Sequence, residues 1–329
     1  MKSRFFIFFS FSFSSNEVTQ MIGILDMLSE EKCFEMIREV RWDDGVRCPW
    51  CESIEVKRNG HVSSHIFCQK YKCKACGKYF DDLTSTVLSD SNLPTKTWVL
   101  CLYLMGLNQS NSQIASELGL RRTTAQEMTS LLREEIQRKS PEPVLSGAVE
   151  MDEVYIVSGH KGRPDIVRRK MRLGRRNRLR GARGRGTLLT EKPPIFGLLQ
   201  RDGSLLMRML PNVRRTSIDP IIRQFVEIGT TVYTDEYDIY SHLPSLGYRH
   251  LTVCHGRREY ARDADGDGIR EVHVNSIEGV WSLLRSWLRP HRGISQEKLP
   301  CYLAFFQFVH NARVRGKSLL LPLMKLLLT

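Results

Sequence analysis

The chain has 329 residues, of which 41% are hydrophobic and 26% are charged, a balance that excludes disordered, collagen-like and polytopic membrane chains. Its 49 Lys and Arg outnumber its 36 Asp and Glu, and the resulting net charge of +13 favours a polyanionic partner. The length fits about two ordinary domains, and a chain of this size with an odd number of cysteines, nine, is unlike a small disulfide scaffold. Four of the cysteines form two CxxC pairs, a spacing that indicates metal binding in a reducing compartment.

The first residues imitate a secretory signal without completing one. Lys2 and Arg4 precede the apolar run Phe5–Phe13. This run is too short to cross a bilayer, which takes about 20 residues, and no clear cleavage site follows it. We therefore expect residues 1–20 to be a disordered or mis-started extension ahead of Met21, and we expect no membrane partner.

A short helix and a zinc ribbon are predicted next, over residues 21–82. Apolar residues recur at helical spacing between Glu30 and Trp42. Two CxxC pairs follow, and each turns tightly enough to place two thiolates on one tetrahedral Zn²⁺. The predicted ligands are Cys48, Cys51, Cys73 and Cys76. Three further residues between the pairs can substitute as ligands, although we interpret them as bystanders: His61, His65 and Cys68.

Residues 90–140 are predicted to form a helix-turn-helix DNA-binding segment. The run from Gln113 to Leu132 contains a helix, a break at Gly119 and a second helix that starts near Thr123. The side chains expected to face DNA are Arg121, Arg122, Thr123, Thr124 and Gln126. The alternative is a plain helical hairpin that joins two domains, because the Pro- and Gly-containing stretch after it is typical of a linker.

The second half, residues 147–320, has the order of elements of an α/β domain. Strands are expected at Ala148–Val157, Ile195–Gln200, Ser204–Leu210 and Thr231–Thr234, and helices at Ile218–Ile228 and Asn275–Leu288. A basic insertion over residues 160–192 separates the first two strands. Between Lys161 and Arg185 it carries twelve Lys or Arg and a single acid, Asp165. Such a run is typical of a solvated segment that can also clamp phosphates.

Three acids fall where a metal-dependent site would need them. Asp152 lies in the first strand of this half, Asp235 just after a later strand, and Glu278 in the first turns of the last predicted helix. Mg²⁺ prefers oxygen ligands and keeps several waters, so a few carboxylates from separate elements are sufficient. Arg285 and Arg289 follow Glu278 along one edge of the helix, where they can bind phosphate. The alternative is an exposed helix edge without a chemical role.

Three motifs together resemble a known family. The run His273–Leu320, which contains the pattern HxNxxEGxW, MDE at Met151–Glu153 and TDEY at Thr234–Tyr237 resemble insertion-sequence transposases of the ISXO type. The resemblance implies a zinc ribbon, a helical DNA-binding segment and an RNase H-like core with an acidic triad. It also implies cleavage and joining of DNA at transposon ends with Mg²⁺ or Mn²⁺, with Asp152 and Asp235 matching the first two acids.

The third metal ligand is open between two residues. Members of the family vary between Glu and Asn here, and this sequence offers both Asn275 and Glu278. We expect Glu278, because a carboxylate neutralises Mg²⁺ where an amide does not. Arg285 also lies seven residues further on, where the family often has Lys. Asn275 can instead cap the helix with its side-chain oxygen.

The sequence is thus expected to encode a DDE-type transposase that binds inverted-repeat ends and target DNA. It is expected to act as a homo-oligomer in the bacterial cytoplasm, associated with the nucleoid. Two rival functions stay open. One is a DNA-binding regulator that keeps the ribbon and the helix-turn-helix without catalysis, and the other is a metal-dependent nuclease that never joins strands.

Overall fold

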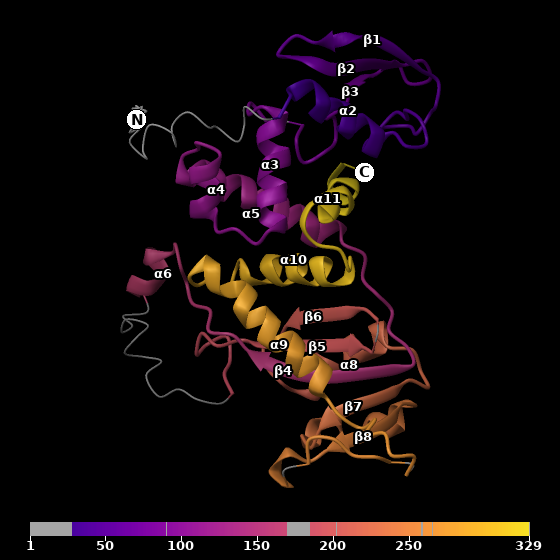
Figure 1. Cartoon of the computed structure of the whole chain (residues 1–329), viewed down its shortest axis with the longest axis vertical. Coiled ribbons are helices and arrows are strands. Elements are labelled where there is room, and N and C mark those ends of the chain that lie inside the picture. The colour runs from indigo at the N-terminus through magenta and orange to yellow at the C-terminus, as the bar shows by residue number, and fades with distance from the viewer. Residues whose placement is uncertain are drawn as a thin grey trace, which may run out of the picture.

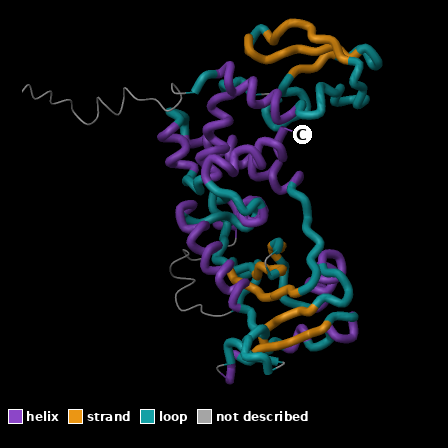
Figure 2. The backbone as a smooth tube through the Cα atoms, turned by 45° about the vertical axis from the view of Figure 1, so that its right-hand side comes forward, coloured by secondary structure: helices purple, strands orange, loops and turns teal. Residues whose placement is uncertain are grey.

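A computed structural model describes residues 28–328 apart from 90, 170–184, 202, 258 and 265. The extension predicted for residues 1–20 and most of the basic insertion therefore lie outside the described residues. Strands gather at two ends of the molecule, and helices occupy the space between them (Figure 2). Within the described part of the chain, no helix combines the length and apolar character needed to cross a membrane.

The N-terminal end is a helix followed by a small three-stranded sheet. Helix α2 (Glu30–Arg41) confirms the first predicted helix. The strands β1 (Val56–Val62), β2 (His65–Cys73) and β3 (Tyr79–Asp81) pair antiparallel in the order β1-β2-β3.

The buried carboxylate of Asp82 joins this sheet to α2. It accepts hydrogen bonds from the Arg38 guanidinium at 3.0 Å, the Tyr71 hydroxyl at 3.0 Å, the Gln69 backbone N–H at 2.8 Å and the Trp42 indole at 3.3 Å. Four donors compensate for the loss of water around a side chain with no exposed surface. The small sheet, whose own apolar core holds few residues, is thereby held against the helix.

The middle of the molecule is a helical layer built from both ends of the chain (Figure 1). It contains α3 (Thr95–Gly106), α4 (Asn111–Glu117), α5 (Arg122–Lys139), α10 (Leu299–Asn311) and α11 (Leu320–Leu328). The predicted helix, break and second helix are present as α4 and α5, with Gly119 at a φ of +62° between them. That this pair reads DNA stays a prediction. Leu323 and Leu327 of α11 pack into the same core as Ile37 of α2, so the end of the chain returns to its beginning.

The other end is a five-stranded mixed sheet in the order β6-β5-β4-β7-β8. Its strands are β4 (Ala148–Tyr155), β5 (Pro194–Gln200), β6 (Leu205–Met209), β7 (Thr231–Asp235) and β8 (Arg249–Val253). Strands β4, β7 and β8 run parallel, whereas β5 and β6 continue antiparallel from β4. The four predicted strands are confirmed to within two residues at each end, and β8 was not predicted.

Helices cover both faces of this sheet (Figure 1). Helix α9 (Asn275–Leu288) and residues of α10 pack on one face, and α8 (Arg215–Phe225) packs on the other. A short helix, α6 (Pro164–Arg169), lies in the basic insertion. Short 3₁₀ helices span Asp238–Tyr240, Leu243–Leu246, His255–Arg257, Arg289–His291 and Gly316–Leu319. The layers confirm the predicted α/β fold class with an RNase H-like core.

One predicted helix is displaced. The helix expected at Ile218–Ile228 begins and ends three residues earlier, and Ile228 is 81% exposed. The helix ends at Phe225 because the residues on either side of Val226 form hydrogen bonds with Leu145. The Leu145 N–H donates to the Phe225 carbonyl, and the Leu145 carbonyl accepts the N–H of residue 227. An isolated β-bridge to Leu145, a residue distant in sequence, therefore ends this helix.

Candidate active site and zinc centre

Two of the predicted acids lie at the carboxyl ends of neighbouring parallel strands. The register between β4 and β7 pairs Ala148 with Thr231 and Glu150 with Tyr233. The same register continued by two residues brings Asp152 level with Asp235. Both side chains are half-buried, and Asp235 also accepts the backbone N–H of Tyr237 at 3.0 Å. This end of the sheet is where parallel strands direct functional side chains.

A buried carboxylate that was not predicted holds helix α9 over this sheet edge. Glu150 has no exposed surface, and its Oε2 accepts the backbone N–H of Ile277 at 2.9 Å. Its Oε1 accepts Arg201 Nε at 2.8 Å and lies 3.2 Å from His273 Nδ1. Glu150 therefore caps the first turn of α9. The alternative, a cap bond from a side chain at the start of the helix such as that of Asn275, is not observed in the described part of the chain. A carboxylate serves this position well because it also interacts favourably with the positive end of the helix dipole.

Trp281 connects α9 directly to Asp152. Its indole Nε1 donates to Asp152 Oδ2 at 2.8 Å. The ring lies against Gly197 of β5, where an added β-carbon would come within 2.2 Å of Cη2 and 2.6 Å of Cζ2. Only glycine at position 197 leaves room for the Trp281 ring to pack this closely against β5. Residues of α9 and β5 thus set the direction of a carboxylate on β4.

Burial, and to a smaller extent the charges of neighbouring carboxylates, disfavours the ionisation of two acids of the site. Burial raises the pKa of Asp152 to about 6, against the lowering effect of the Trp281 hydrogen bond, and the charges of Asp235 and Glu278 add to the rise. Burial also raises the pKa of Glu153 to about 7, while the Tyr240 hydroxyl donates to this carboxylate. Mutual repulsion of this kind is relieved by a bound cation.

The remaining predicted residues lie along the exposed edge of α9. Asn275, Glu278 and Arg285 are all exposed. Arg285 lines a depression of about 300 Å³ together with Arg289. The charges of Asp235 and Glu278 thus act on Asp152, but the oxygens of the three acids do not form a compact ligand cluster in the described part of the chain.

The four predicted zinc ligands do form such a cluster. The sulfur atoms of Cys48, Cys51, Cys73 and Cys76 all lie within 4.8 Å of one another. The pairs Cys48–Cys76 and Cys51–Cys73 are each 3.6 Å apart. Tetrahedral zinc with Zn–S bonds of about 2.3 Å would separate its sulfurs by about 3.8 Å, so the thiols fit a structural zinc ion.

The surroundings of the cluster also fit a zinc centre. The backbone N–H of Cys76 lies 3.5 Å from Cys73 Sγ and lowers the pKa of that thiol to about 7, which favours the thiolate that binds metal. A backbone hydrogen bond from Ser53 lowers the pKa of Cys51, but burial and the hydrogen bonds with the other three thiols outweigh it and raise that pKa to about 12, an effect that a bound zinc ion would reverse. Cys68 is buried, and this burial raises its pKa to about 12. Neither it nor His61 or His65 belongs to the cluster, in agreement with their interpretation as bystanders.

Two acids of the site were overlooked in the sequence, although a signal was present. Glu150 and Glu153 flank Met151 and Asp152 in the run EMDE, inside a strand whose other residues are mostly buried. Charges in such a strand need partners. The alternation of a strand places Glu150 and Asp152 on the face toward α9 and Glu153 on the opposite face, toward Tyr240.

Comparison with known proteins agrees with both halves of this description. Residues 144–311 match the ISXO2-like transposase domain, and residues 28–79 match the transposase zinc-ribbon domain. An uncharacterized protein in transposable element ISH50 of Halobacterium salinarum is 34% identical over 306 residues, which make up 91% of this chain and 97% of that protein.

Two more distant similarities were also found. An uncharacterized transposase-like protein of Haemophilus influenzae is 26% identical over 119 residues, 36% of this chain and 90% of that protein. The cryo-EM structure of a simian T-cell lymphotropic virus intasome in complex with PP2A regulatory subunit B56 gamma contains a chain with 11% identity and a TM-score of 0.28. That similarity covers 63% of this chain and 68% of the other, and at this score it carries no argument.

Proposed function

The chain belongs to the ISXO2-like transposase family, and we propose that it cleaves DNA at insertion-sequence ends and joins the freed strands to target DNA. The observation that carries this proposal is the convergence of Asp152 and Asp235 at one sheet edge beneath α9, whose first turn carries Glu278. Burial raises the pKa of Asp152, and the charges of Asp235 and Glu278 add to the rise, as expected of a carboxylate placed where a cation would offset both effects.

In this proposal Asp152, Asp235 and Glu278 hold Mg²⁺ or Mn²⁺. When bound, the metal neutralises charge at the scissile phosphate and lowers the pKa of the attacking water or 3′-hydroxyl. Trp281 fixes the orientation of Asp152 through its hydrogen bond. Arg285, two turns beyond Glu278 on the same helix, is exposed and is assigned to a DNA phosphate.

DNA binding is assigned to the helical segment and to the basic insertion. Arg122, Thr123 and Gln126 are exposed at the start of α5, as the helix-turn-helix prediction requires. Arg185, near the end of the insertion, lies with its guanidinium 3.7 Å from the ring centre of Tyr237, two residues after Asp235. A homo-oligomer on DNA in the bacterial cytoplasm, associated with the nucleoid, completes the proposal.

The test is a strand-transfer assay with labelled DNA that contains the element's ends. Asp152→Asn, Asp235→Asn and Glu278→Gln should each abolish cleavage in Mg²⁺ and leave end binding nearly intact, because each removes a metal ligand and little surface. Asn275→Ala should only weaken activity. If Glu278→Gln cleaves at the wild-type rate while Asn275→Ala is inactive, Asn275 is the third ligand.

The same assay separates the rival functions. A regulator without catalysis would shift the mobility of end-containing DNA but leave every strand intact. A nuclease would release cut strands and form no joined product with target DNA. Joined product from the wild-type chain, and none from Asp152→Asn, is the result expected of a transposase.

A further inference from the structure

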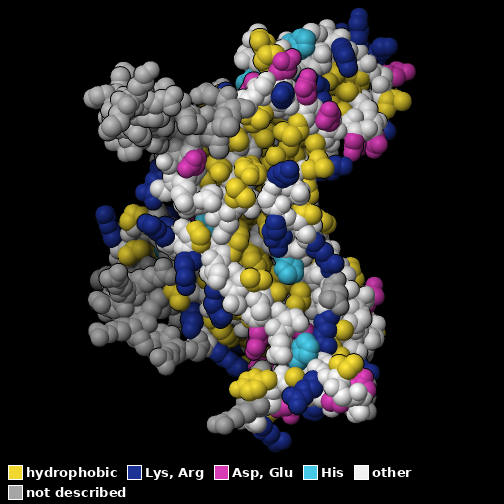
Figure 3. All heavy atoms as spheres, viewed as in Figure 1, with side chains coloured by type: hydrophobic (Ala, Val, Ile, Leu, Met, Phe, Trp, Pro, Cys, Tyr) yellow, Lys and Arg dark blue, Asp and Glu magenta, His cyan; other side chains and the backbone are white. Residues whose placement is uncertain are grey.

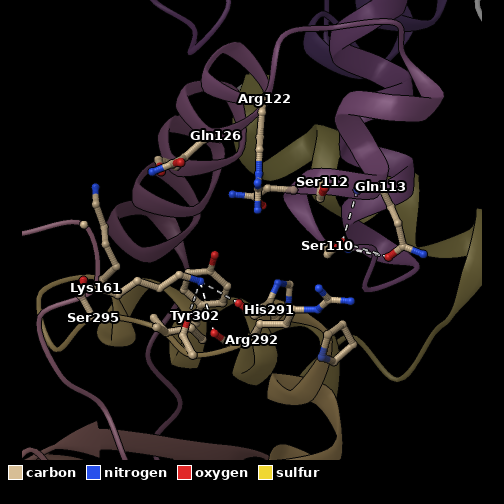
Figure 4. Close-up of a pocket in the computed structure, with 17 residues that line it drawn as sticks. Ser110, Ser112, Gln113, Arg122, Gln126, Lys161, His291, Arg292, Ser295 and Tyr302 are labelled. Atoms are coloured by element: carbon tan, nitrogen blue, oxygen red, sulfur yellow. Dashed lines mark hydrogen bonds between the residues drawn. The ribbon is translucent and has the colours of Figure 1, made fainter. Parts of the chain in front are cut away.

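A polar cavity of about 660 Å³ lies between the helical layer and the end of α9, outside the acidic site. Figure 4 shows Arg122 pointing into it from α5, with His291, Arg292 and Tyr302 on the opposite side. Gln126 of α5 also lines it. The volume is within the range of about 300–1,000 Å³ that is typical of ligand-binding clefts. The cavity therefore has room for a ligand that contacts both layers.

The walls of the cavity are basic. Four cations line it, and none of the described residues in its lining is acidic: Arg122, Lys161, Arg292 and Lys298. Lys161 Nζ donates to the carbonyls of His291 and Gly293 at 3.0 and 2.8 Å, and Lys298 pairs with Glu134, so both lysines help to build the wall. Arg122 and Arg292 are exposed. Lys and Arg side chains gather on this side of the molecule between α5 and the end of α9 (Figure 3).

A buried arginine stands behind this wall without an acidic partner. Arg133 of α5 is 2% exposed, and it makes no ion pair with a carboxylate of the described residues. Its Nη1 donates to the Thr129 carbonyl at 3.2 Å, and its Nε has no partner. The guanidinium lies 4.2 Å from the ring centre of Tyr302, which lines the cavity. A buried charge without a counter-ion is costly, and an anion in the cavity would offset that cost.

The histidine in the lining, His291, is neutral and does not change the charge of the cavity. His291 is 8% exposed, and its Nε2 lies 3.1 Å from Asn108 Oδ1. Burial together with the charges of Arg133 and Lys161 lowers the pKa of His291 to about 3. The ring is therefore uncharged near neutral pH, and the arginines and lysines determine the charge of the cavity.

The cavity also connects the helical layer with the catalytic helix. The depression of about 300 Å³ beside α9 shares Gly293 and Ile294 with it and continues to Arg285 and Arg289. A chain of phosphates can thus pass from α5 along the loop after α9 to the helix that carries Glu278. A small free anion would use only part of this path, whereas a DNA strand would use all of it.

We propose that this cavity binds the sugar–phosphate backbone of DNA, with Arg122 and Arg292 contacting phosphates and Arg133 behind them as a buried cation. The inference rests on the proposed function, because it names the route by which substrate DNA reaches the acidic site. The contacts are to phosphates, so they contribute affinity and position and little sequence preference.

The test is a salt titration of end-DNA binding by the full chain, followed by fluorescence anisotropy. Each phosphate contact contributes about −0.9 to the slope of log K against log salt. The slope for the double variant Arg122→Gln/Arg292→Gln should therefore be shallower by about 1.8. With equal affinities at 1 M salt, the variant should bind roughly 60-fold more weakly than the wild-type chain at 0.1 M salt. The matched control is Arg223→Gln/Arg249→Gln, which removes two exposed arginines of α8 and β8 and should keep the wild-type slope.

A second variant tests the buried cation. Arg133→Met should keep or raise the melting temperature of the free protein, because it removes an uncompensated buried charge, and should weaken DNA binding at least several-fold. If Arg133 only supports the fold, the melting temperature should fall while DNA affinity stays unchanged. That outcome, or an unchanged slope for the Arg122/Arg292 double variant, would overturn the inference.

Two further readouts separate this inference from the proposed function and from other phosphate ligands. A reduced slope in the double variant, with no cleavage even by the wild-type chain, would uphold the DNA path and reject the transposase reaction. Normal cleavage and joining by the wild-type chain, with no change of slope in the double variant, would uphold the transposase reaction and reject the DNA path. Pyrophosphate should compete poorly with the duplex at equal phosphate concentration, and competition as strong as that of DNA would assign the cavity to a free phosphate compound instead.

Discussion

A β-carbon on residue 197 would collide with the ring that orients Asp152. In Gly197→Ala the new atom would lie 2.2 Å from Cη2 of Trp281 and 3.1 Å from Cδ1 of Ile277. Both side chains are buried, so the ring must move away from β5. Such overpacking costs roughly 1–3 kcal/mol, and loss of the 2.8 Å bond to the Asp152 carboxylate adds roughly 1.5–3 kcal/mol.

We therefore expect Gly197→Ala to lower the free energy of unfolding by roughly 2.5–6 kcal/mol. At roughly 2–4 °C per kcal/mol for a domain of this size, the melting temperature should fall by about 5–24 °C. Thermal unfolding followed by near-UV circular dichroism, which is sensitive to the tryptophan environment, measures both effects. DNA cleavage should fall as well, because Asp152 loses its only indole donor among the described residues.

The neighbouring helix offers a matched control. Gly279 of α9 has no atom within 4 Å of its added β-carbon, so Gly279→Ala should stabilise the protein by up to about 1 kcal/mol through helix propensity. In a Trp281→Phe background the contacts with Cη2 and Cζ2 of the indole are absent and only the 3.1 Å approach to Ile277 Cδ1 remains, so Gly197→Ala should then cost much less. An equally large loss in that background would refute the steric explanation.

Three further predictions concern charge and metal. The pKa of Asp152 is about 6 in the folded protein and 3.8 ordinarily, so the folded state favours the protonated carboxyl. Asp152 therefore does not lower stability below about pH 4, and stability falls as the pH rises through 6 and the carboxyl ionises. In Mg²⁺-free buffer Asp152→Asn should thus stabilise the protein by up to about 3 kcal/mol at pH 8 and scarcely at pH 4, and equal effects in urea unfolding at both pH values would contradict this. Glu150→Gln should cost about 3 kcal/mol because it leaves Arg201 without its buried partner, whereas Glu142→Gln, which breaks the pair of a 51% exposed carboxylate, should cost less than about 1 kcal/mol in the same measurement. Metal analysis should find one zinc per wild-type chain and none in Cys51→Ser, while Cys254→Ser, outside the cluster, should retain it; zinc retained in both variants would reject the assigned ligands.

Features that depend on short-range spacing could be predicted from the sequence. The two CxxC pairs are each closed by local backbone bonds, such as the Gly77 N–H to the Cys73 carbonyl at 3.1 Å. The apolar stripe of α9 identified that helix at its observed bounds, Asn275–Leu288, and Gly119 marked the turn between α4 and α5. In each case the interactions that define the feature lie within a few residues, so the pattern is visible in the sequence itself.

The packing of α10 could not be predicted from the sequence. Helix α10 contributes Phe305 and Val309 to the helical core and Leu303 and Phe306 to the core over the sheet. A helix that is buried on two sides is apolar nearly all round, so its sequence does not indicate which surface each side faces. Its two partners became identifiable only once the chain had folded back on itself.

In the candidate site, too, the sequence indicated the residue types, whereas the structure was needed for their arrangement. The types of its acids and their places near strand ends were visible, which made Asp152, Asp235 and Glu278 reasonable candidates. Their arrangement depends on Glu150, which binds the N–H of a residue 127 positions away, and on Trp281, which donates to a carboxylate 129 positions away. The buried charge of Arg133, which forms no ion pair with a carboxylate of the described residues, likewise became apparent only when packing removed it from water. Contacts of such long range leave no periodic pattern in the sequence, because only the folded chain brings their two halves together.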